Sequence, residues 1–173
     1  MVTARPAVGD VWAILEQIAD PELPAVSIVD LGIVRDVAWT GDSNAAALRV
    51  AITPTYSGCP AMRAIEREIV DRLAAHGIDR VVLEVWLAPA WTTDWMTAAG
   101  REKLRAYGIS PPGSRAAATA GSIDLVSVPD ERAHCPRCGS TTAELISRFG
   151  STACKALYRC TVCREPFDHF KRH

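Results

Sequence analysis

The sequence predicts an α+β fold, with helices packed on one face of a small sheet, followed by a small zinc-ribbon β domain. Three observations support this prediction. Helical and strand periodicities alternate through the first part of the chain, the composition shifts to Ser, Gly, Pro and Ala after Pro111, and two Cys-x-x-Cys pairs follow. We therefore expect an α+β domain at residues 1–110, a linker at 111–130 and a four-cysteine zinc ribbon at 131–173.

The first domain should open with an amphipathic helix. Asp10 favours a helix N-cap, and apolar residues recur behind it at helical spacing. These residues are Val11, Ile14, Leu15 and Ile18. The helix should end in the segment Asp20-Pro21-Glu22-Leu23-Pro24, because closely spaced prolines prevent a helix from continuing. Asp20 and Glu22 therefore place two carboxylates on a stiff loop.

The rest of this domain should form a β-hairpin, a helix, a third strand and a last helix. Residues 33–40 are rich in β-forming side chains and residues 47–52 alternate, with a Gly-Asp-Ser-Asn turn between them. The next helix carries apolar side chains on one face. They are Met62, Ile65, Ile69 and Leu73. Residues 81–87 alternate as a strand that can pair beside the hairpin, and a helix is expected from about 94 to 107.

The composition excludes several classes of protein. The chain has 173 residues, a formal net charge of −1 and a pI of about 6.4, so no overall field draws it to nucleic acid or to an anionic membrane. No apolar run approaches the roughly 20 residues that cross a bilayer, and the N-terminus lacks a hydrophobic signal segment. We expect a cytoplasmic protein without a membrane or nucleic-acid partner.

Two cysteine pairs near the C-terminus have the spacing of a metal site. They are Cys135-Pro-Arg-Cys138 and Cys160-Thr-Val-Cys163. Two residues between paired cysteines let both sulfurs of one turn face the same ion, and two such turns complete a tetrahedron. In a reducing compartment such pairs hold metal more often than they form disulfides. The pattern predicts zinc, with an iron–sulfur cluster as the alternative occupant.

Cys59 is the leading candidate for a functional thiol. Gly58 before it permits a sharp turn, and Pro60 after it favours the first position of a helix, which would put Cys59 at the N-cap. The helix dipole and the unpaired N–H groups would then favour the thiolate, which binds metal or attacks electrophiles. The alternative is a small buried side chain that fills space between helix and sheet.

Three other residues carry weaker signals. Asp20 and Glu22 could accept a proton, ligate a hard cation or complement a basic partner, or they could be solvated turn residues. Cys154 lies between the two cysteine pairs and could be an inert packing group, a redox partner or an additional metal thiol. Lys155 would help to stabilise its thiolate if the two side chains face each other.

Three segments of the first domain resemble the SufT-like family of iron–sulfur assembly factors. They are Asp20 to Pro24, Ser27 to Val34 and Thr53 to Pro60. Further on, the first cysteine pair and the segments Phe149 to Ala156 and Tyr158 to Phe167, which contains the second pair, extend this resemblance. With them, the whole chain is similar to the PaaD family. That family consists of small accessory proteins of the phenylacetyl-CoA ring-epoxidising oxygenase. Two domain signatures in this order are more specific than either alone.

The resemblance implies a protein that is not an enzyme on its own. It would help to mature or maintain the oxygenase, whose system contains a diiron carboxylate subunit and a reductase with an iron–sulfur cluster. The family's Asp-Pro-Glu loop falls on residues 20–22 and its cysteine loop on residues 53–60, with Cys59 as the thiol that transiently ligates iron or a cluster. The ribbon would dock an oxygenase or reductase subunit. Because one thiol cannot hold a cluster, a client or a second copy, in a homodimer through the first domain, would supply other ligands.

Two other classes of function stay open. A zinc-ribbon nucleic-acid-binding module predicts salt-dependent binding, which the near-neutral charge and sparse basic clusters disfavour. A thiol-dependent enzyme with Cys59 as nucleophile needs a base beside the thiol. The nearest histidine in the sequence, His76, lies at the far end of the following helix.

Overall fold

A computed structural model describes three stretches of the chain, residues 5–41, 46–113 and 133–172. The chain divides into two compact units. The first runs to Trp91 and also contains Trp95–Gly100, whereas the second contains Thr92–Asp94 and the chain from Arg101 onward. The second unit thus begins before the boundary expected after residue 110. Most of the expected linker, from residue 114 on, lies outside the described stretches.

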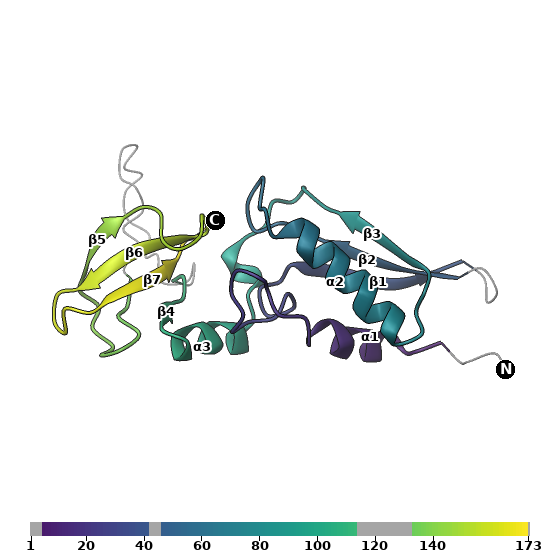
Figure 1. Cartoon of the computed structure of the whole chain (residues 1–173), viewed down its shortest axis with the longest axis horizontal. Helices are drawn as coiled ribbons and strands as arrows, with labels where there is room; N and C mark the ends of the chain where they lie inside the picture. The colour runs from purple at the N-terminus through teal and green to yellow at the C-terminus, as the bar shows by residue number, and fades with distance from the viewer. Residues whose placement is uncertain (1–4, 42–45, 114–132, 173) are drawn as a thin grey trace. The chain divides into compact units, whose positions relative to one another are not determined.

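The first unit is a three-stranded sheet with helices packed against it (Figure 1). Its elements are α1 (Val8–Leu15), β1 (Val34–Thr40), β2 (Ala47–Ile52), α2 (Met62–Ala75) and β3 (Val81–Val85). The strand order is β1-β2-β3, with β1 antiparallel and β3 parallel to β2. This topology confirms the predicted α+β fold and the position of the third strand beside the hairpin.

The core of the first unit forms because one face of each element is apolar. Alternate residues of β2 are buried, and so is one helical stripe of α2. These residues are Leu48, Val50, Ile52, Ile65, Ile69 and Leu73. The other face of the sheet carries a charged cross-strand group, in which Arg49 forms ion pairs with Asp36 and, at 3.3 Å, with Glu84.

The loop before β1 is held by the buried carboxylate of Asp30. This carboxylate accepts hydrogen bonds from the backbone N–H of Ser27 (3.1 Å) and from the hydroxyl of Thr97 (3.0 Å). Gly32 follows with φ 69°, and a Cβ atom there would lie 2.5 Å from the carbonyl oxygen of Trp95. Asp30 is therefore a structural turn residue.

We expect Gly32→Ala to destabilise the first unit more than Gly77→Ala does. Both glycines have positive φ angles, 69° and 76°, so each substitution adds about 1–2 kcal/mol of backbone strain. Only at Gly32 would the new methyl group meet backbone atoms, which adds roughly 1–3 kcal/mol of overpacking. The midpoint of urea unfolding should fall further for G32A, and equal midpoints would contradict this close approach.

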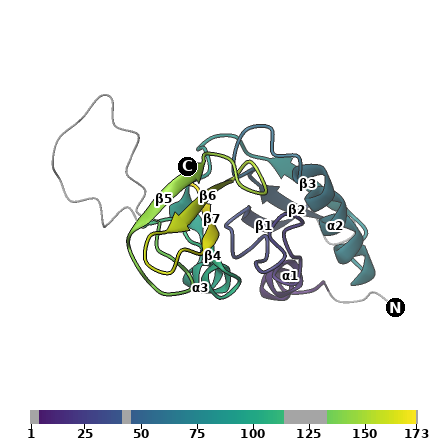
Figure 2. The same ribbon diagram turned by 60° about the vertical axis from the view of Figure 1, so that its left-hand side comes forward.

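The second unit contains a four-stranded sheet. Its strands are β4 (Ile109–Ser110), β5 (Ala143–Ser147), β6 (Lys155–Cys160) and β7 (Pro166–Phe170), in the order β4-β7-β6-β5 (Figure 2). β4 runs parallel to β7, and the ring of His169 hydrogen-bonds the buried hydroxyl of Ser110 at 3.0 Å. This pairing explains why residues 101–110 belong to the second unit. A strand of two residues is too short to be recognised from the sequence.

The last predicted helix is divided in two. A 3₁₀ turn, η1 (Thr93–Trp95), precedes α3 (Ala98–Ala106), where one helix from 94 to 107 was expected. Thr97 interrupts them because its hydroxyl accepts the N–H of Gly100 at 2.9 Å and so caps α3. None of the helices in the described stretches is both long and apolar enough to cross a bilayer.

Candidate functional site

The cysteine loop lies at the carboxyl end of β2 and leads into α2. Gly58 has φ 85°, a conformation that glycine adopts without strain, and the turn is closed by a hydrogen bond from the Cys59 N–H to the Tyr56 carbonyl oxygen (3.3 Å). The N-cap of α2 is Ala61 and the helix begins at Met62. The prediction that Cys59 is the N-cap is therefore wrong, because an additional turn separates it from the helix.

The surroundings of Cys59 favour the protonated thiol. Burial raises the pKa of this half-buried side chain, and the carboxylates of Glu22 and Asp20 raise it further. The backbone N–H of Ala61 and the hydroxyl of Tyr56 act in the opposite direction but do not outweigh them. The expected preference for thiolate is thus also wrong. The same carboxylates would attract a cation, and a coordinating cation displaces the thiol proton.

The Asp-Pro-Glu loop lies close enough to this thiol for the charges of Glu22 and Asp20 to raise the pKa of Cys59. Asp20 is buried, and its carboxylate Oδ1 accepts the N–H groups of Glu22 (2.9 Å) and Leu23 (2.8 Å). Asp20 is therefore not a solvated turn residue: it closes the loop, whereas Pro21 is exposed at its tip. The half-buried Glu22 is the better candidate for a carboxylate ligand next to Cys59.

Thr53 and Tyr56 complete the cysteine loop. Thr53 is buried, and its N–H donates to the carbonyl oxygen of Ile33 at 2.9 Å, which fixes the start of the loop. Among the described residues its hydroxyl has no hydrogen-bond partner. Tyr56 was not predicted from the sequence to belong to the site, although a tyrosine three positions before the cysteine is placed to reach the sulfur.

We expect Glu22→Gln to make Cys59 more reactive. Removing this negative charge lowers the pKa of the thiol, so more thiolate is present at pH 8 and alkylation by iodoacetamide is faster. The wild-type rate should still rise above pH 9, because the pKa lies above its ordinary value of 9.0. Peptide-level mass spectrometry of the protein, with zinc in the four-cysteine site and no iron added, measures this rate. Glu16→Gln serves as the control, and a rate unchanged by E22Q would contradict the proximity of Glu22.

The four ribbon cysteines converge on one point. Their sulfur atoms all lie within 4.8 Å of one another, with 3.7 Å between Cys135 and Cys163 and 3.5 Å between Cys138 and Cys160. Four thiolates around a tetrahedral zinc ion with Zn–S bonds of about 2.3 Å would be separated by about 3.8 Å. The arrangement therefore fits a single tetrahedral ion.

The two cysteine turns have the same backbone geometry. In the first, Gly139 N–H donates to the Cys135 carbonyl oxygen (2.9 Å), and in the second Arg164 N–H donates to that of Cys160 (3.1 Å). Both donors have positive φ, 75° and 64°. The N–H of Cys163 also donates to the Cys160 sulfur at 3.4 Å, and such donors lower the pKa of Cys160 to about 6. Burial and the other ribbon sulfurs, in contrast, raise the pKa of Cys163 to about 12. An ion that binds all four sulfurs would displace the remaining thiol protons.

Cys154 is not a member of this group of four. It is buried, and its sulfur lies 3.0 Å from the hydroxyl of Thr152. The adjacent Lys155 forms an ion pair with Asp168 at 3.5 Å. The environment of Cys154 is that of a packing side chain, and the Lys155 ammonium group is paired with Asp168.

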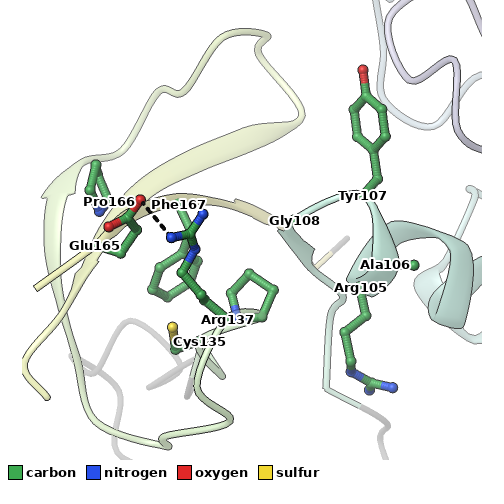
Figure 3. Close-up of a pocket in the computed structure, with 10 residues that line it drawn as sticks. Arg105, Ala106, Tyr107, Gly108, Cys135, Arg137, Glu165, Pro166 and Phe167 are labelled. Carbon is green, nitrogen blue, oxygen red and sulfur yellow. Dashed lines mark ion pairs between the residues drawn. The ribbon is translucent and has the colours of Figure 1, made fainter. Parts of the chain in front are cut away.

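A pocket of about 440 Å³ adjoins the metal site within the second unit (Figure 3). It is lined by the end of α3, by the first cysteine turn, including Cys135, and by Glu165 with the start of β7. Arg137 forms an ion pair with Glu165 at 3.5 Å on one wall, and Arg105 pairs with Glu102. Because both guanidinium groups already have carboxylate partners, the pocket is a poor anion site.

Comparisons with known proteins match both parts of the chain. Residues 9–82 match the family model described as iron–sulfur cluster assembly protein, and residues 122–171 match that of the PaaD zinc beta ribbon domain. The chain thus belongs to the class of proteins in which an iron–sulfur assembly domain precedes a zinc β-ribbon.

A relative of nearly the same length identifies the family. The chain is 50% identical over 168 residues to a protein of Escherichia coli (strain K12) that is named as a putative 1,2-phenylacetyl-CoA epoxidase subunit. The match covers 97% of this chain and 94% of that protein. The chain belongs to the PaaD family, which confirms the resemblance inferred from its motifs.

Solved structures match more than half of the chain. A domain of unknown function, DUF59, from Bacillus anthracis matches with a TM-score of 0.50 and 30% identity, over 56% of this chain and 90% of that chain. A conserved hypothetical protein from Thermotoga maritima matches with a TM-score of 0.48 and 27% identity, over 59% of this chain and 97% of that chain. The first of these likenesses supports the α+β assignment.

Proposed function

We propose that this protein is an accessory factor, not an enzyme on its own, that helps to assemble a metal centre of the multicomponent phenylacetyl-CoA epoxidase in phenylacetate catabolism. The client centre is the iron–sulfur cluster of the reductase or the diiron centre of the oxygenase. The name of the E. coli relative and the match to an iron–sulfur assembly domain support this proposal. The observation that carries it is the convergence of Cys59 with the carboxylate loop.

Cys59 acts as a transient ligand for the iron or cluster that is transferred. The carboxylates of Glu22 and Asp20 attract an iron ion to Cys59. Binding of the iron to the Cys59 sulfur then releases the thiol proton. One thiol and one available carboxylate leave several coordination positions open. The client supplies the remaining ligands, so transfer needs the exchange of only a few bonds.

The ribbon has a structural and docking role. Four thiolates close the coordination shell of zinc and leave no position for a substrate. The sulfur separations of 3.5 and 3.7 Å favour a single ion, because the bridging sulfides of a cluster would hold the cysteines farther apart. Leu145 and Ile146 on β5 and Phe149 after it are exposed apolar side chains that a client subunit could cover.

The site favours metal handling over thiol catalysis. A nucleophilic cysteine needs a lowered pKa or an adjacent base, and the pKa of Cys59 is raised by burial and by two carboxylates. His76 is the C-cap of α2, at the opposite end of the helix from Cys59. Cys59 is therefore better suited to bind a cation than to attack an electrophile.

Anaerobic loading of the full chain with ferrous iron and sulfide tests the proposed metal site. The wild-type protein should retain iron beyond the metal content of the four-cysteine site, with a visible absorption band if sulfide is included. Cys59→Ser should lose this additional iron, whereas Ser57→Ala, a substitution at an exposed position of the same loop, should keep it. Equal iron retention by C59S and the wild type would overturn the assignment.

A further inference from the structure

β3 is the one regular and unprotected sheet edge within the described stretches. Native proteins protect exposed edge strands with bulges, short length, lysine or proline. A bulge interrupts β1 between Val34 and Asp36, a second interrupts β5 between Leu145 and Ser147, and β4 has only two residues. β3 instead pairs with β2 in an unbroken register from Val81 to Val85. It lies at one edge of its sheet (Figure 1).

The outer edge of β3 offers a row of backbone hydrogen-bonding groups. Arg80 accepts from the N–H of Leu48 at 2.8 Å, and Trp86 donates to the carbonyl oxygen of Ile52 at 2.8 Å, so even-numbered residues of this strand face β2. In a parallel ladder the intervening residues direct both N–H and C=O the other way. These residues are Val81, Leu83 and Val85, and β2 is the only strand that pairs with β3 in the described chain.

The side chains beside this edge are apolar and exposed. Val82 is 48% exposed, Val85 47% and Leu87 69%, and β3 contains neither lysine nor proline. Its one charged residue, Glu84, is already paired with Arg49 (3.3 Å). Desolvation of this edge would therefore bury apolar surface without leaving an unpaired charge.

The geometry points to a homodimer in which β3 pairs antiparallel with β3 of a second copy, which joins two sheets into one of six strands. A two-fold axis at Leu83 places the outward-facing Val81 opposite Val85, so the free N–H and C=O groups match. On the other face it places Val82 opposite Glu84, and Arg80 opposite the ring of Trp86. No like charges oppose each other in this register. The self-complementarity of one strand favours a second copy over an unrelated partner.

This dimer has a consequence for the cysteine loop, and that consequence alone rests on the proposed function. Cys59 follows the carboxyl end of β2, which is parallel to β3. Antiparallel pairing of two β3 strands puts these carboxyl ends, and hence the two thiols, at opposite ends of the joined sheet. The two Cys59 residues could not share one cluster, and the client would supply the missing ligands.

Mass measurement on the full chain tests the dimer. Sedimentation velocity over a concentration series should give twice the 18.7 kDa of the chain at high concentration. Val85→Pro removes an outward N–H and keeps the bonds to β2, so it should weaken association roughly 100-fold. A monomer at every concentration, or a dimer that V85P leaves unchanged, would overturn the proposal. A monomeric V85P that still supports Cys59-dependent iron loading would separate this inference from the proposed function.

Two substitutions at one position test the register. Val82→Lys would face Glu84 of the second copy and keep the dimer, whereas Val82→Glu would place two carboxylates together and weaken it. Both lose the same apolar side chain. Val82 also lies opposite Arg49 of its own sheet, which favours Glu over Lys within the monomer, so tighter dimerisation of V82K than of V82E reports the pairing with the second copy. Hydrogen exchange should also become concentration-dependent at the amides of Val81, Leu83 and Val85. Equal dimerisation of V82K and V82E, or β3 protection only when client subunits are added, would contradict a second copy.

Discussion

Removal of the ion from the four cysteines will unfold the ribbon and leave the first unit folded. The small core of the ribbon contains two of the ligands themselves, because Cys135 and Cys160 pack with Ala133 and Phe167. Structural zinc contributes about 10–16 kcal/mol of apparent binding free energy in small ribbons and fingers, more than such a core can replace. The first unit has a core of its own and contains none of the four cysteines, so it should stay folded.

The positions of the tryptophans make this outcome measurable. The chain has five tryptophans, and all of them belong to the first unit. A chelator strong enough to remove the metal should leave tryptophan fluorescence unchanged, while the amides of β6 and β7 lose protection from hydrogen exchange. Cys160→Ser should behave in the same way, and Cys154→Ala should retain the ion. Protected β6 and β7 amides in the metal-free protein would contradict a metal-dependent fold.

Replacing Cys59 by Ser will reduce client maturation by roughly 100-fold or more. A serine hydroxyl does not deprotonate near neutral pH and is a poor ligand for iron compared with a thiolate. The C59S protein should still fold, because Cys59 is only half-buried and is not one of the four metal-binding cysteines of the ribbon. Glu22→Gln should cause a smaller loss, of about 10-fold, because it removes attraction for the cation but keeps the sulfur.

Cells that lack this chain and carry the oxygenase system provide the assay. Iron content and specific activity of the purified oxygenase and reductase should recover with the wild type and with Ser57→Ala. They should not recover with C59S. Recovery with C59S, at equal protein levels, would show that maturation does not need Cys59. The ribbon would then be the remaining candidate for the functional site.

The spacing of residues predicted most of the first unit. The helical stripe of Ile65, Ile69 and Leu73 and the alternation of Leu48 and Val50 are local patterns, and the structure buries them as expected. The four ribbon cysteines were predictable for the same reason, since each turn of two intervening residues sets the direction of its own pair of sulfurs. Local sequence was sufficient wherever the structure depends on near neighbours.

The features that sequence reasoning missed depend on contacts between distant segments. β4 exists because Ile109 pairs with Asp168, and Thr97 divides the last helix because it bonds Asp30. The pKa of Cys59 was predicted in the wrong direction because the extra turn before α2 and the approach of Glu22 could not be read from a single loop. Local motifs identified the residues of this site but not their electrostatic environment.

Direct transfer of iron between purified proteins tests whether Cys59 delivers metal to a client subunit. The full chain, loaded anaerobically with radioactive iron and sulfide, is mixed with metal-free oxygenase and reductase subunits, and the label on each client is counted after separation. We expect transfer from the wild type at a rate above that from free iron, and no such acceleration with C59S. Equal transfer by the wild type and C59S would contradict a role of Cys59 in metal delivery.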